Sequence, residues 1–448
     1  MGINMAESLT PAFQFGEPNK SVFIAKDTVA IEIDGSTYIG NGEVRLDLIP
    51  QAAVHIYSEF QGIPPSVSLP IFLGQKEITS FAFCGKRVDG FSLGLGGEVQ
   101  KQEAVLKWLL EPDPMVGRGN ESTAIQQLVF HLFNFKDFIG IRRSSEQRGS
   151  SLYTIEHVEL VSDSWRVELR SLVETRDNIK KLNAEGGYGL THVGLLKKPD
   201  GATFAGKDAE EALHALKLFF SFAKGIWCNP LCAVGFDASG NRIWESWSSP
   251  EAAWHSAFSW FDPHHSEQLT GLFPGFITKW NHEDWREALT EVIYWYQNSN
   301  SSRGIDAGII LTQAAIERLS YEYSVKDRKL IEANGFKDLR ASDKLRLLFS
   351  SLDIPIDIPN SLPEMTKLAK QFKWIDSPHA LTEIRNSLVH PENRRRGHYS
   401  DIYAEAWNLG LWYLELALLR ICGYSGSYSN RLASTRWVGT VEEVPWQR

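Results

Sequence analysis

The spacing of apolar residues changes once along this chain of 448 residues, and that change limits the folds it can adopt. Between about residues 20 and 200, apolar and polar residues alternate in short runs, which is the period of strands with one buried face. From about residue 280 to 423, apolar residues recur every three to four positions, the period of amphipathic helices. The sequence therefore predicts an α+β multidomain protein, with a β-rich sandwich or barrel-like domain followed by an all-α helical bundle.

The predicted N-terminal strands are short and are separated by turn residues. Asp34-Gly35 and Asn41-Gly42 are such turn signals, because Gly and Asn tolerate positive φ. The predicted strands are Ser21–Ile24, Val29–Ile33, Val44–Leu48, Val54–Tyr57, Ile78–Phe83, Ala104–Leu110, Gln127–Phe135, Thr154–Val161 and Trp165–Glu174. We expect residues 1–18 to form a tail and residues 19–200 to form the β-rich domain, which would sense or recruit an unidentified ligand.

Residues 201–275 are predicted to connect the two parts. Glu210–Lys224 has helical spacing, and Leu231–Phe236 and Asn241–Trp247 flank an Asp-Ala-Ser-Gly turn that is typical of a hairpin. Eight tryptophans lie between Trp227 and Trp295. Aromatic faces can stack on bases or sugars, but such clusters more often fill a core, and we expect these rings to pack between domains.

The C-terminal part, residues 276–425, is predicted to be a bundle of roughly six helices. Pro residues and an Asn-Gly pair between the periodic stretches mark helix ends. The predicted helices include Glu283–Gln297, Asp306–Tyr323, Ser342–Leu352 and Ile402–Cys422, and residues 426–448 are predicted to be a tail.

Composition argues against several classes of protein. No run of about 18 apolar residues could span a membrane, and the first residues lack the basic and apolar regions of a secretory signal. The four cysteines show no disulfide framework, which predicts a cytoplasmic protein. Cys228-x-x-x-Cys232 has no second pair of ligands nearby, and the adjacent histidines of the turn-like Asp262-Pro263-His264-His265 cannot easily share one ion. We therefore expect no metal and no other cofactor.

One short segment near the C-terminus concentrates residues that can handle a phosphodiester. Arg385, Asn386 and His390 lie within Glu383–Pro391. Arg offers a planar fork of donors to phosphate oxygens, and His transfers protons near neutral pH. The sequence therefore predicts a catalytic site that contains Arg385 and His390.

The helix that carries these residues is predicted from its caps and its apolar stripe. Ser377 is the expected N-cap, Pro378 suits the first turn, and Pro391 ends the helix near His390. Ala380, Leu381, Ile384 and Leu388 form the expected buried stripe. On a regular helix Arg385 and His390 would lie about 140° apart. We therefore expect them to converge on one phosphate only at an unwound helix end or across a symmetric dimer.

A family resemblance lies in the segment Glu383-Ile384-Arg385-Asn386-Ser387-Leu388-Val389-His390-Pro391, which resembles the signature of the HEPN superfamily, most nearly its Apea-like branch. The resemblance covers about residues 280–425. It implies a metal-independent endoribonuclease, usually a homodimer through the helical bundle, often a toxin or an antiviral defence effector. Arg385 would stabilise phosphate charge, Asn386 would position substrate or partner, and His390 would transfer protons. Other branches place a Tyr two residues after the His, where this chain has Glu392.

The implied reaction is internal transfer within RNA, either single-stranded RNA or tRNA. The ribose 2′-hydroxyl would attack its own 3′-phosphate, which excludes DNA as a substrate. Arg394, Arg395 and Arg396 follow the motif and are predicted to bind the RNA backbone, unless they form only a solvated loop. The formal net charge is −9, but the acidic excess lies before residue 280. A local basic patch could therefore still bind RNA.

Other interpretations stay open. Arg and His at a helix end can simply stabilise the terminal carbonyls. The bundle could be a non-catalytic HEPN module for dimerisation or RNA binding, and the chain could instead bind a ligand through its β-rich domain and tryptophans. Gly90-Phe91-Ser92-Leu93-Gly94 matches the string of a nucleophile elbow. No helix is expected directly after it, so we interpret it as a β-turn.

Overall fold

The computed structural model describes residues 9–73, 75, 77–96, 103–148, 151–301, 304–390 and 399–447. The chain groups into two compact units, each assembled from separate segments. The first contains the chain up to Asn134 together with Glu174–Glu210 and Pro230–Trp254, and the second contains Phe135–Val173, Glu211–Asn229 and the chain from His255. The predicted fold class is confirmed at this level, because the protein is a mixed α/β multidomain protein with a β-rich N-terminal part and C-terminal helices.

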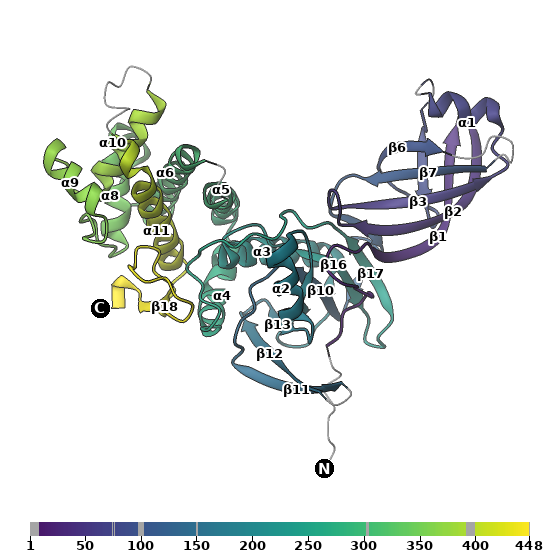
Figure 1. Ribbon diagram of the computed structural model, residues 1–448, viewed down its shortest axis with the longest axis horizontal. Helices are drawn as coiled ribbons and strands as arrows, with labels where there is room; N and C mark the ends of the chain where they lie inside the picture. Colours follow the sequence, from purple (N-terminus) through teal and green to yellow (C-terminus); the bar gives the residue numbers. More distant parts are fainter. Residues whose placement is uncertain are drawn as a thin grey trace, which may run out of the picture. The chain divides into compact units, whose positions relative to one another are not determined.

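Seven of the described strands form an antiparallel half-barrel sheet at the start of the first unit (Figure 1). In sheet order they are β5 (Lys86–Arg87), β4 (Ser80–Phe83), β1 (Val22–Ile33), β2 (Ser36–Asp47), β3 (Ala53–Gln61), β7 (Glu103–Leu110) and β6 (Gly90–Gly96), and the short helix α1 (Pro65–Phe72) follows β3. Val44 and Leu46 are buried, whereas Arg45 between them is exposed. Successive side chains of a strand point to opposite faces, so one set lies in the core and the other lies on the opposite face of the sheet.

Two glycine-containing segments of this sheet differ from the sequence prediction. Asn41 and Gly42 lie inside β2, so the turn predicted there is wrong. A Cβ atom on Gly42 would lie 2.4 Å from the Val29 side chain, so the close approach of the strands requires glycine. The segment from Gly90 to Gly94 lies in strand β6, so the β-turn predicted there is also wrong.

The rest of the first unit is built on a second group of strands. In order of pairing they are β14 (Leu190–Lys197), β10 (Gln127–Phe133), β16 (Pro230–Phe236), β17 (Arg242–Trp247) and β8 (Met115–Arg118). The strands β9 (Ala124–Ile125) and β15 (Phe204–Ala205) pair with each other, and the helix α2 (Thr175–Glu185) completes the unit. The β16–β17 pair confirms the hairpin predicted from the sequence.

His131 on β10 attaches the N-terminal segment to these strands. Its Nδ1 donates to the carbonyl oxygen of Leu231 at 3.0 Å, and its Nε2 accepts the backbone N–H of Ala12, also at 3.0 Å. Arg242 donates to the carbonyl oxygen of Ala12, and the ring of Phe15 packs against the imidazole. Burial lowers the pKa of His131 to about 4. The imidazole is therefore neutral at pH 7, as these two hydrogen bonds require.

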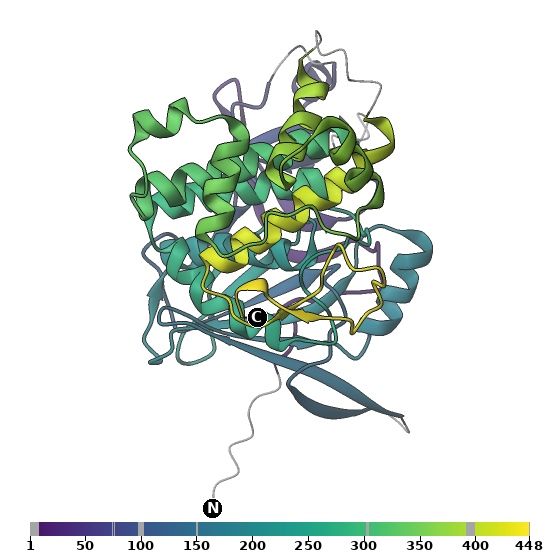
Figure 2. The same ribbon diagram turned by 90° about the vertical axis from the view of Figure 1, so that its left-hand side faces the viewer.

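Helices dominate the second unit (Figure 2). After α3 (Gly206–Lys224) they are α4 (Glu267–Trp280), α5 (Glu283–Asn300), α6 (Ile305–Tyr321) with a π-helical turn (Glu322–Asp327), α7 (Ala333–Asp338), α8 (Ala341–Ser351), α9 (Pro363–Phe372), α10 (Ser377–Val389) and α11 (Tyr403–Ile421). The other elements are the antiparallel strands β11 (Arg142–Arg148), β12 (Ser151–Val161) and β13 (Arg166–Ser171), the pair β18 (Ser427–Tyr428) and β19 (Glu442–Glu443), and two 3₁₀ turns (Ser400–Ile402 and Pro445–Gln447).

The helix α11 forms the centre of the second unit and packs against α5, α6 and α10. It is apolar on nearly all sides, which is the pattern of a fully buried helix. Its Glu415 is buried and accepts hydrogen bonds from Tyr296 at 2.7 Å and from Arg431 at 2.6 Å. This buried pair attaches the C-terminal segment to the bundle. Within the described residues, no helix is long and apolar enough to cross a membrane.

Candidate functional site at the end of α10

The start of α10 is fixed by a carboxylate rather than by the hydroxyl that the sequence predicted. Asp376 is the N-cap, and its Oδ1 accepts the backbone N–H of His379 at 2.9 Å. The Ser377 hydroxyl instead donates to the carbonyl oxygen of Asp357, so the prediction of Ser377 as N-cap is wrong. Arg346 of α8 donates two hydrogen bonds to the carboxylate of Asp376, the shorter of which is 2.6 Å.

The inward face of α10 agrees with the predicted apolar stripe. Ala380, Leu381 and Ile384 are buried, and Leu388 is half-buried. These side chains pack toward α6, α8 and α11, which hold the helix in the bundle. Asn386 and Arg385 are half-buried beside this stripe. The local fold therefore leaves both polar residues within reach of solvent.

The helix ends at His390, as Pro391 predicts. The backbone of His390 is extended, with φ −102° and ψ 108°, and its N–H donates to the carbonyl oxygen of Asn386 at 3.0 Å. The His390 side chain is exposed. The predicted RNA-binding residues Arg394, Arg395 and Arg396 lie outside the described residues.

The guanidinium of Arg385 differs from the other partly or fully buried arginines of the bundle. Its Nη1 donates to Oδ1 of Asn386 at 3.3 Å, and its buried Nε has no hydrogen-bond partner within the described residues. In contrast, Arg318, Arg346 and Arg431 each have a carboxylate oxygen at 2.6 Å. A half-buried cation without a counter-ion is unfavourable unless an anion is supplied from outside. The arrangement can therefore accept an oxyanion at Arg385.

The structure brings two of the three predicted catalytic residues together. Arg385 and Asn386 are joined by a hydrogen bond, whereas five positions separate Arg385 from His390. On a regular helix this separation corresponds to about 140°. His390, however, has an extended backbone, so this angle does not fix its direction, and an unwound helix end of this kind is one of the two arrangements in which we expect Arg385 and His390 to converge on one phosphate.

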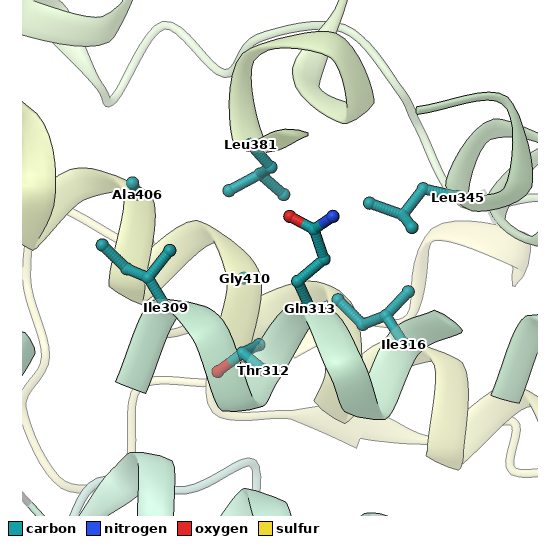
Figure 3. Close-up of a pocket in the computed structure, with 8 residues that line it drawn as sticks. All are labelled: Ile309, Thr312, Gln313, Ile316, Leu345, Leu381, Ala406 and Gly410. Carbon is teal, nitrogen blue, oxygen red and sulfur yellow. The ribbon is translucent and has the colours of Figure 1, made fainter. Parts of the chain in front are cut away.

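A small cavity lies behind α10, between α6, α8 and α11 (Figure 3). Gln313 of α6 projects into it between Leu345 and Leu381, and the Gln313 Oε1 atom is buried without a hydrogen-bond partner in the described structure. The small residues Ala406 and Gly410 of α11 leave the space open. The volume open to the centre of a water molecule is only about 10 Å³, so the cavity has room for one water at most and for no larger ligand.

Several weaker sequence candidates are resolved by their surroundings. The eight tryptophans are buried or partly buried; Trp247 packs on Phe83 within the first unit, and Trp260 packs on Phe222 within the second. None of the eight is an exposed stacking platform. His265 Nδ1 lies 2.8 Å from Glu267, and the described residues contain no group of three side chains that could hold a metal.

Sequence reasoning missed a polar hollow on the half-barrel sheet of the first unit. It is centred on the β2 residues Asn41 and Glu43 and the β3 residues Tyr57 and Glu59, and its volume is about 300 Å³. Alternation along β2 was the available signal, because Glu43 and Arg45 alternate with buried Val44 and Leu46. The neighbouring strands that complete the hollow could not be identified from that signal.

Comparison with known proteins identifies the family of the chain. Residues 120–257 match the family model of the YopA central domain, and residues 282–443 match that of the YopA C-terminal domain. The SPbeta prophage-derived uncharacterized protein YopA of Bacillus subtilis (strain 168) is 30% identical over 331 residues, which cover 72% of this chain and 73% of that protein. No solved structure matches significantly. The HEPN resemblance is therefore wrong, because the region that carries it matches the YopA C-terminal domain and no HEPN family is found. The chain belongs to the YopA family.

Proposed function

We propose that the C-terminal helical part binds RNA at the end of α10 and cleaves it without a metal, in the cytoplasm. The observation that supports this proposal is the guanidinium of Arg385, which is half-buried and lacks a carboxylate partner within the described residues. A phosphodiester would supply the missing anion and could accept two parallel hydrogen bonds from the guanidinium. The proposal rests on this local chemistry and not on the family assignment.

Arg385 would stabilise negative charge, and His390 would transfer a proton. In the proposed reaction the 2′-oxygen of a ribose bonds to the adjacent phosphorus, and the bond from phosphorus to the 5′-oxygen breaks. His390 accepts the proton of the 2′-hydroxyl. The leaving 5′-oxygen takes a proton from water or from His390 of a second copy of the chain. Arg385 binds the phosphate oxygens, on which negative charge grows, and Asn386 holds Arg385 in place.

The test is cleavage of total RNA and of purified tRNA by the full chain in EDTA. Removal of one donor to a developing oxyanion lowers rates by about 100- to 1,000-fold, and removal of a general acid or base lowers them by about 100- to 10,000-fold. Arg385→Ala and His390→Ala should therefore both abolish measurable cleavage. Arg420→Ala is the matched control, because Arg420 is another helical arginine of the bundle but is paired with Asp353. This control should cleave like the wild type.

The products separate this proposal from its alternatives. Products that end in a 2′,3′-cyclic phosphate and are lost in both variants support the proposal. Cleavage that survives Arg385→Ala would show that the site lies elsewhere. RNA binding that depends on Arg385 without any cleavage would indicate a binding module, and absence of both would contradict the proposal.

A further inference from the structure

The solvent-facing side of the half-barrel sheet carries two rows of side chains that run across four strands. The registers of β1, β2, β3 and β7 place Lys26, Glu43, Tyr57 and Lys107 in one row. The adjacent row, two residues further along each strand, is Thr28, Asn41, Glu59 and Val105. Side chains at paired positions lie about 5 Å apart. Residues distant in the sequence therefore form one continuous surface.

A hydrogen-bond network holds one edge of this surface in place. Its centre is the carboxylate of Asp47, which lies 2.8 Å from Nδ1 of His55 and accepts the hydroxyl of Tyr57 at 2.5 Å. Burial alone would raise the pKa of Asp47, but the hydrogen bonds from His55, Tyr57 and Ser21 hold it well below its usual range. Asp47 is therefore ionised at neutral pH, and its hydrogen bond fixes the position of the Tyr57 ring.

Two cations restrict the Tyr57 ring further. The Arg45 guanidinium lies 5.5 Å from the ring centroid, and the Lys107 ammonium lies 5.0 Å from it. Arg45 and Lys26 are also paired with Glu43, at 2.5 Å and 2.9 Å. These contacts hold the side chains that line the hollow in place before a ligand binds, which lowers the entropy cost of binding.

The hollow has the size of a small-molecule site and no net charge. Its volume of about 300 Å³ is at the lower end of the range of about 300–1,000 Å³ that is typical of such sites. Lys26 and Arg45 contribute two positive charges to the lining, and Glu43 and Glu59 contribute two negative charges. A polyanion such as RNA would meet these carboxylates, so the lining favours a neutral ligand.

The side chains of Asn41 and Glu59 remain available for hydrogen bonds, and they favour a ligand that carries hydroxyl groups. Asn41 and Glu59 are directly opposite each other, and neither side chain has a hydrogen bond or ion pair in the described structure. The amide of Asn41 donates and accepts, whereas the carboxylate of Glu59 only accepts. Neighbouring hydroxyl groups on a sugar ring can satisfy both at once, because each hydroxyl donates one hydrogen bond and accepts others. We propose that this hollow binds a neutral saccharide.

The test is binding of the full-length protein to an array of neutral oligosaccharides built from glucose, galactose, mannose and N-acetylglucosamine. The array also carries sulfated oligosaccharides and short RNA. Any saccharide that binds is then titrated by calorimetry. Asn41→Ala combined with Glu59→Ala should weaken binding at least about ten-fold, because two hydrogen bonds are lost and one of them is to a charged group.

Glu32→Ala is the matched control, because Glu32 is an exposed carboxylate of the same sheet outside the hollow. It should bind the saccharide like the wild type. The proposal would be overturned if no neutral saccharide bound, or if only acidic ligands bound. It would also be overturned if Glu32→Ala weakened saccharide binding as much as the double variant does. The Arg385→Ala variant separates this inference from the proposed RNA site, because it should retain full saccharide binding.

Discussion

Arg431 and Glu415 form the buried ion pair whose removal should have the largest effect on the second unit. Their side chains are 2% and 0% exposed, and Arg431 Nη2 lies 2.6 Å from Glu415 Oε1. At an effective dielectric constant of about 20, Coulomb's law gives about 6 kcal/mol of attraction at this distance. Much of that attraction offsets the desolvation of two charges. Arg431→Met leaves Glu415 buried and unpaired, and we expect it to lower the free energy of unfolding by about 3–5 kcal/mol.

A double variant distinguishes loss of the charge pair from simple loss of packing. In Arg431→Met with Glu415→Gln neither position carries a charge, and the new amide oxygen can still accept the hydroxyl hydrogen of Tyr296. We expect this double variant to unfold within about 1–2 kcal/mol of the wild type. The assay is urea unfolding followed by circular dichroism of the helices. A single variant as stable as the wild type, or a double variant less stable than the single one, would refute the reasoning.

A helix cap, a buried histidine and the cavity behind α10 each allow a further test. Asp376→Ala removes the cap of α10 and the partner of Arg346, and it should lower the free energy of unfolding by about 2 kcal/mol, whereas Asp376→Asn should lower it less, as measured by urea unfolding. The pKa of His131 is about 4 when folded and about 6.5 when unfolded, so the unfolded chain binds an extra proton between these values. The stability of the first unit should therefore fall by roughly 3 kcal/mol as the pH drops from 6.5 to 4, and unfolding curves of His131→Gln should lack this component. Gln313→Leu removes the hydrogen bond from Nε2 to Glu317 together with a buried amide oxygen that has no partner within the described residues. The second effect should be the larger, so the melting temperature should rise and the gain in stability should be about 1 kcal/mol; a lower melting temperature would contradict the description of that cavity.

Elements with a strong period could be predicted from the sequence. The predicted helices Asp306–Tyr323 and Ile402–Cys422 correspond to α6 and α11 with ends displaced by at most two residues. Both helices bury a continuous apolar surface, so the period alone is sufficient. In contrast, α4 contains Pro274 and two glycines, which mask its helical pattern. It is stabilised by burial of its apolar side chains against the rest of the second unit, which is tertiary information.

The candidate sites show the same distinction between local and long-range information. The end of α10 at His390 could be predicted, because Pro391 restricts the residue before it. The lack of a carboxylate partner for Arg385 among the described residues could not, because it depends on which carboxylates the other helices bring near. The hollow on the half-barrel depends on β3 lying between β2 and β7. No local pattern in the sequence specifies that strand order.

The measurement that tests the central claim most directly is the affinity of the full chain for a short single-stranded RNA as a function of salt concentration. Each phosphate contact contributes about −0.7 to the slope of log affinity against log salt concentration for single strands. If Arg385 binds a phosphate, Arg385→Ala should weaken binding by about 10- to 150-fold and should make the slope shallower by about 0.7. Arg420→Ala should leave both quantities unchanged. Equal affinity and equal slope for the wild type and Arg385→Ala would contradict the assignment of this site to RNA.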